Sequence, residues 1–120
     1  MSLTTIFASA IIAQAPVPAP DVAYWELVRG ENQAAIERIE ANGDLARDDP
    51  ARLINLGIAH AREGRVEEAR ALFRSAARSE DSARLETATG AWLDSRDLAR
   101  TALQMLARGE FSTAMQMAAR

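Results

Sequence analysis

Only a few side chains in this sequence could do chemistry, and His60 comes first because it is the only histidine. A single histidine cannot form a two-histidine metal site. His60 also shares a predicted helix face with Leu53 and Leu56, so we interpret it as a packing residue. The chain has no cysteine, which excludes disulfides, thiolate metal sites and a cysteine nucleophile.

Paired carboxylates, which can act as general acid and base, occur at positions 48–49, 67–68 and 80–81. All three pairs fall at predicted helix starts or in loops, where solvation and the helix dipole account for them. Ser95 lies near Asp94 and Asp97 without a base, and we interpret it as part of a helix cap. The glycines are isolated and form no phosphate-binding loop. We therefore predict a protein that is not an enzyme and has no metal or cofactor.

The length of 120 residues predicts a single domain with a modest core. The chain has 14 arginines and no lysine against 17 acidic residues, for a net charge of −3. Mixed charge with a small negative excess gives no electrostatic reason to bind phosphate backbones. Nucleic acid is therefore not an expected partner.

Residues 1–20 carry no charged side chain and include an apolar run over positions 3–13. That run is too short to span a bilayer, which needs roughly 20 apolar residues, so no stable membrane insertion is expected. Together with Ala13 and Ala15 in an A-x-A spacing, it predicts a signal peptide and a periplasmic or secreted protein, although no basic residue precedes it and Pro16 follows. Ala8 and Ala10 offer another cleavage site. A disordered segment of a cytoplasmic protein is the alternative, and the prolines at 16, 18 and 20 predict an extended linker in either case.

From residue 21 onward the apolar spacing is helical. The clearest part is a pair of antiparallel helices over 50–79, with Asp49 as cap and Pro50 as first residue. Gly64 provides the turn between the two helices. The second helix has a predicted buried stripe at Ala69, Leu72, Phe73 and Ala76.

Several residues recur at a spacing of 34, including Gly30 with Gly64, Ala35 with Ala69 and Ile39 with Phe73. The middle unit resembles a tetratricopeptide repeat, whose pattern is W-x2-L-G-x2-Y, then A-x3-F, then P. The matching positions, with three substitutions relative to the pattern, are Leu53, Leu56, Gly57, His60, Ala69, Phe73 and Asp81. The resemblance implies an all-α fold, a short solenoid of about three antiparallel helix pairs of which the first and last are degenerate.

The predicted domain covers 21–120, with units at about 21–49, 50–83 and 95–120. The first unit has helices over 22–29 and 32–42 and Gly43 as a C-terminal cap. The third unit is recognised by RGEFSTA at 108–114, which is similar to RGENQAA at 29–35. Its Gly109 lies 45 residues after Gly64, so about eleven residues are inserted.

We place this insertion at 84–94, where helical periodicity fails. Leu85, Thr87, Trp92 and Leu93 have strand-like types on either side of Gly90. A two-residue turn at 89–90 would set Thr87 opposite Trp92 in a small β-hairpin. An irregular loop held by Trp92 is the alternative. A new helix capped by Asp94 or Ser95 follows.

The resemblance implies binding of an unidentified protein or peptide in a concave groove lined by the first helix of each pair. The implied groove and partner-binding positions are Ile54, Asn55, Ile58, Ala61 and Arg62, joined by Trp92 on the insertion. Some members of the family clamp a peptide carboxylate, and the corresponding positions here are Asn55, Arg96 and Arg100. The positions of that clamp in the first repeat fall on Pro20 and Tyr24, which lack the needed donors.

Two functions follow from this pattern. The first is a protein-interaction module, such as an adaptor, scaffold or assembly factor. The second is a structural protein completed as a homodimer at its C-terminal edge, where Phe111, Met115 and Met117 are predicted to lie in a last helix. We interpret these residues in the first place as part of an ordinary core.

Overall fold

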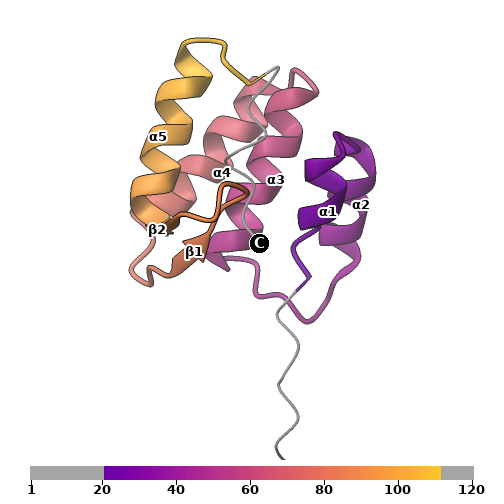
Figure 1. Ribbon diagram of the computed structural model, residues 1–120, viewed down its shortest axis with the longest axis horizontal. Coiled ribbons are helices and arrows are strands. Elements are labelled where there is room, and N and C mark those ends of the chain that lie inside the picture. The colour runs from indigo at the N-terminus through magenta and orange to yellow at the C-terminus, as the bar shows by residue number, and fades with distance from the viewer. Residues whose placement is uncertain (1–20, 112–120) are drawn as a thin grey trace, which may run out of the picture.

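The computed structural model describes residues 21–111, a mostly helical chain with one small two-stranded antiparallel sheet (Figure 1). The prediction of a helical fold is confirmed at this level. In chain order the elements are α1 (Tyr24–Val28), α2 (Asn32–Ala41), α3 (Pro50–Arg62), α4 (Val66–Arg78), β1 (Arg84–Glu86), β2 (Trp92–Asp94) and α5 (Ser95–Ala107). Among these residues, no helix has the length and apolar character needed to span a bilayer.

Three turns of the same geometry end α1, α3 and α5. Gly30, Gly64 and Gly109 have φ angles of 76°, 80° and 69°, which is left-handed backbone that glycine adopts without strain. In each turn the glycine N–H donates to the carbonyl three residues earlier, and the next N–H to the carbonyl five residues earlier, over 2.8 to 3.2 Å. This is the Schellman pattern. The predicted turn glycines are therefore confirmed.

The main core takes side chains from each of the helices α1 to α5, and α3 packs against α4 within it. Gly57 permits this approach, because a Cβ on it would lie 2.5 Å from the ring of Phe73. Phe73 is fully buried and stacks on Phe111, with ring centroids 5.5 Å apart. The predicted stripe on α4 is buried at Ala69, Phe73 and Ala76, and Leu72 packs on its edge.

Side-chain caps begin α3 and α5 as predicted. The Asp49 carboxylate accepts a hydrogen bond from the Arg52 N–H at 2.9 Å, and Pro50 is the first helical residue. The Asp94 carboxylate accepts from the N–H groups of Arg96 and Asp97 at 2.9 and 3.3 Å. Both caps satisfy donors that have no partner inside a helix.

The first helix pair differs from its prediction at both ends. α1 begins at Tyr24 rather than Val22, because the Asp21 carboxylate accepts from the Ala23 N–H at 3.0 Å and Ala23 takes a left-handed φ of 60°. α2 ends at Ala41, and Asn42 is the cap in extended conformation. Its amide group donates to the Asp21 carbonyl at 3.2 Å. Gly43 has no left-handed φ, so its predicted role as the cap is wrong.

The insertion forms a β-hairpin, with a pairing one residue away from the predicted one. Leu85 lies opposite Leu93, and Glu86 rather than Thr87 lies opposite Trp92. Thr87 N–H donates to the Ala91 carbonyl at 2.9 Å, and Gly90 takes a φ of 84°. The loop therefore has three residues, and the left-handed position falls on Gly90 alone, so no threonine needs a positive φ.

The predicted continuation of the third unit, with Met115 and Met117, lies outside the described residues. So do the predicted signal peptide and proline linker at 1–20. The third Schellman turn and Phe111 lie inside them.

Candidate functional site

The predicted groove positions of α3 are not on an open surface. Ile54, Asn55 and Ile58 are all 0 % exposed, because α3 is enclosed by its neighbouring helices. Ala61 is partly buried. These residues are therefore core and framework residues in this structure, and a partner could reach them only if a covering element moved.

Asn55 and Arg62 instead hold the N-terminal end of the domain. The Asn55 amide nitrogen donates to the Val22 carbonyl at 2.9 Å. The Arg62 guanidinium donates to the Leu27 carbonyl at 2.9 Å and lies 3.4 Å from the side-chain oxygen of Asn32. Burial lowers the pKa of Arg62. The two side chains thus bind one backbone carbonyl before α1 and one in its last turn.

The three residues at the carboxylate-clamp positions do not come together as a clamp. Arg96 donates to the Glu80 carbonyl at 2.6 Å, beyond the end of α4. Arg100 pairs with Asp97 at 2.8 Å on the exposed face of α5. Asn55 is fully buried against the segment before α1. Each side chain serves a separate local contact.

His60 is partly buried at the end of α3. Its Nδ1 atom lies 3.4 Å from a guanidinium nitrogen of Arg65, and burial together with that cation holds the pKa of His60 below its ordinary value. A lowered pKa favours the neutral ring, which can accept a hydrogen bond from Arg65. Within the described residues, no cluster of His, Asp or Glu side chains could hold a metal ion.

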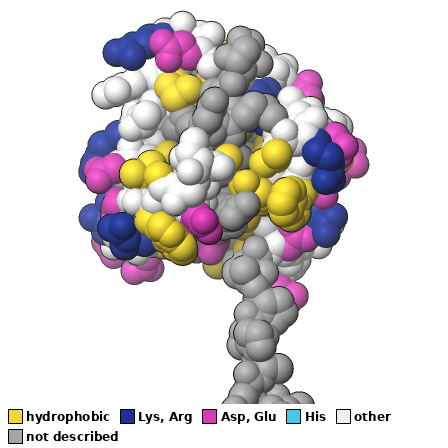
Figure 2. Space-filling view, viewed as in Figure 1, with side chains coloured by type: hydrophobic (Ala, Val, Ile, Leu, Met, Phe, Trp, Pro, Cys, Tyr) yellow, Lys and Arg dark blue, Asp and Glu magenta, His cyan; other side chains and the backbone are white. Residues whose placement is uncertain are grey.

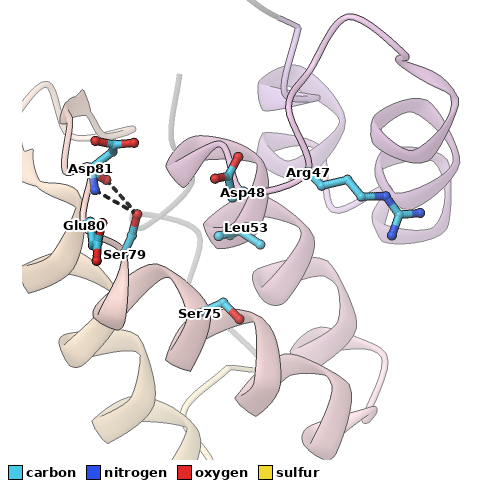
Figure 3. Close-up of a pocket in the computed structure, with 7 residues that line it drawn as sticks. All are labelled: Arg47, Asp48, Leu53, Ser75, Ser79, Glu80 and Asp81. Atoms are coloured by element: carbon cyan, nitrogen blue, oxygen red, sulfur yellow. Dashed lines mark hydrogen bonds between the residues drawn. The ribbon is translucent and has the colours of Figure 1, made fainter.

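An open hollow of about 420 Å³ lies near the start of α3 and the end of α4 (Figure 3). The residues that line it include the acidic Asp48, Glu80 and Asp81 and the apolar Leu53. The Ser79 hydroxyl is used locally, since it donates to the Asp81 carbonyl at 2.8 Å. Figure 3 shows the side chain of Arg47 extending away from the acidic groups. The antiparallel helices predicted over 50–79 were the signal that two acidic pairs would meet here, because the start of the first helix and the end of the second lie at the same end of such a helix pair.

Large apolar side chains are exposed on the hairpin, on α1 and, at Val66, on α4. Trp92 is 56 % and Leu93 is 41 % exposed on the hairpin, and Trp25 is 60 % exposed on α1. Trp92 was predicted as a binding residue, whereas Trp25 was not. A signal for it existed: Trp25 lies two positions before the buried Leu27, which is about 200° around the axis of a helix with 3.6 residues per turn. On the face shown in Figure 2, hydrophobic side chains lie in separate places among charged ones.

Comparison with known proteins adds no relative: no family model, curated protein or solved structure matches this chain. The functional conclusion therefore has to come from the residues and their geometry.

Proposed function

We propose that the protein is a non-enzymatic protein-interaction module built as a short tetratricopeptide-like array. Two features support the array: the turns of the same geometry at Gly30, Gly64 and Gly109, and the close fit of Gly57 against Phe73. In such an array the helices hold a surface rigid and a partner docks on it. Export to the periplasm remains part of the proposal, and N-terminal sequencing of the mature chain tests it.

The exposed pair on the hairpin is the observation that carries the interaction proposal. Leu85 and Thr87 anchor one face of the hairpin in the domain, and Thr87 is only 2 % exposed. On the opposite strand, Trp92 and Leu93 are left in solvent, with their side chains on opposite faces of the hairpin. Exposed tryptophan on a well-held element is typical of binding hot spots, because it adds large contact area with little loss of side-chain freedom.

Affinity capture with the purified protein as bait tests this proposal. We expect a specific partner to be retained by the wild type and lost with the double variant Trp92→Ala/Leu93→Ser. The matched control is Val66→Ser, because Val66 is 39 % exposed but lies on α4. Equal capture by all three proteins would contradict a role for the hairpin.

Self-association is the competing function, and light scattering over a concentration range separates the two. A dimer that persists without a client protein supports the structural alternative. A monomer that captures a partner through Trp92 supports the interaction module.

A further inference from the structure

The segment at 21–28, which we call the N-terminal strap, lies on α3 in the manner of a bound peptide. We infer that the α3 surface beneath this strap is a peptide-binding site, that the strap fills it as an internal ligand, and that a partner segment of matching chemistry replaces it. This inference rests on the proposed interaction function and names the site and the ligand chemistry for it.

Two side chains of α3 bind the backbone of the strap. Asn55 and Arg62 are seven residues apart, so they lie on one face of α3 two turns from each other. They donate to the carbonyls of Val22 and Leu27, both at 2.9 Å. Because these acceptors are backbone groups, the bonds do not depend on which side chains the strap carries. A partner segment that presents carbonyls at the same spacing can accept them equally well.

Other contacts define the side chains that the site selects. Leu27 is 0 % exposed and provides the apolar anchor. Arg38 on α2 binds the carboxylates of Asp21 and Glu26 at 2.6 and 2.9 Å. The matching ligand is therefore a short segment with two carboxylates five residues apart and a leucine directly after the second.

The strap is built so that it can be replaced. α1 has only five residues, which is too short for a stable helix by itself, and Trp25 in its middle is 60 % exposed. Ala23 has a left-handed φ of 60°, a conformation that is strained for alanine. A partner with glycine at that position binds without this strain.

The turn at Gly30 connects the strap to α2 and fixes its position. A Cβ on Gly30 would meet no atom within 4 Å, but its φ of 76° is unfavourable for alanine. Gly30→Ala therefore weakens the turn without a clash and favours release of the strap. Gly64→Ala is the matched control, since Gly64 has a φ of 80°, equal open space and a position between α3 and α4.

The test uses a fluorescein-labelled peptide with the sequence of residues 21–29, DVAYWELVR, and full-length protein in fluorescence anisotropy titrations. We expect weak binding to the wild type and about fivefold tighter binding to Gly30→Ala, as the strain of alanine in a left-handed turn implies. Gly64→Ala should bind like the wild type. A peptide carrying Leu27→Asp should not bind to any of them.

Hydrogen exchange on the wild type keeps the inference testable if Gly30→Ala does not fold. The Leu27 N–H donates to the Ala23 carbonyl at 3.1 Å, so its exchange reports opening of the strap. We expect this amide to exchange well before the core amides of α3 and α4. Exchange at the same rate as the core would overturn the inference.

The outcomes separate this inference from the proposed function. If the peptide binds neither the wild type nor a folded Gly30→Ala protein, while capture of a partner still depends on Trp92, the strap inference fails and the interaction function stands. If the peptide binds as expected but the Trp92→Ala/Leu93→Ser variant captures the partner normally, the hairpin proposal fails and the strap site stands.

Discussion

The first and second helix pairs share one turn geometry but are held together by different forces. In the second pair, α3 and α4 each have thirteen residues and meet through Gly57 and Phe73. In the first pair, α1 has five residues and α2 has ten, and Ala23, which corresponds to Gly57, lies before the helix in left-handed conformation. Polar side chains add to the attachment here, with Arg38 joining α1 to α2 and Arg62 joining it to α3.

This difference shows that a repeated turn does not ensure repeated packing. A glycine turn needs only local backbone conformation, whereas close packing of two helices needs a small residue inside the first helix and a large one opposite. The first pair has the turn at Gly30 but starts its helix too late to place Ala23 within it. We therefore expect α3 and α4 to provide most of the free energy of unfolding. The contacts of α1 are the ones that a partner segment is expected to replace.

The largest expected effect comes from removing the ring at the centre of the second pair. Phe73→Ala leaves a cavity beneath Gly57 and Phe111, and we expect a loss of about 3 to 5 kcal/mol in the free energy of unfolding. Urea unfolding followed by circular dichroism measures it. Val66→Ala, at a partly exposed position of the same helix, is the control and should change stability by about 0.5 kcal/mol or less. A loss below that of the control would contradict the central role of Phe73.

Opposite substitutions at the two corresponding positions sharpen the comparison. Gly57→Ala places a methyl group against the Phe73 ring and should cost about 1 to 3 kcal/mol. Ala23→Gly relieves a left-handed backbone while removing one buried methyl group, two effects of about 1 kcal/mol that oppose each other. We expect nearly unchanged stability for Ala23→Gly in the same urea experiment. Equal losses for both variants would mean that the two pairs are packed alike.

Strong acid should loosen the first pair through Asp21. The hydrogen bond from the Ala23 N–H, and then the Arg38 guanidinium, hold the pKa of Asp21 below its ordinary value. The folded state thus favours the ionised carboxylate. Asp21 therefore stabilises the fold fully above about pH 4, and this stabilisation is lost as the pH falls further. In a Trp92→Phe protein, fluorescence of Trp25 should report this change below about pH 4. Asp21→Asn should remove it, and an unchanged transition in that variant would contradict the assignment.

The smallest effect is expected at His60, near the end of the second pair. Because burial and Arg65 lower its pKa, the folded state disfavours the charged ring. Stability is then full above about pH 6.5 and falls as pH drops below that value. Urea midpoints at pH 7.5 and 5.5 measure the change. His60→Gln should flatten this difference, whereas the same pH dependence in the variant would show that other groups cause it.

Features that depend on a few neighbouring residues were predictable from the sequence. Asp49 and Asp94 as caps, Gly30, Gly64 and Gly109 as turns, and a hairpin near Gly90 all follow from local backbone preferences. The hairpin register was wrong by one residue, because a three-residue loop lets glycine alone take the left-handed position.

The surface was decided by tertiary structure. Sequence periodicity shows that Ile54, Asn55 and Ile58 share a side of α3, but whether that side is open depends on where another segment docks. The strap docks there through backbone carbonyls, which leave no pattern in the sequence. The sequence by itself determined the helices, their caps and their turns, since these rest on local conformation. Only the tertiary structure decided that the expected groove is filled and that Trp25, Trp92 and Leu93 remain exposed, since burial depends on segments far apart in the chain.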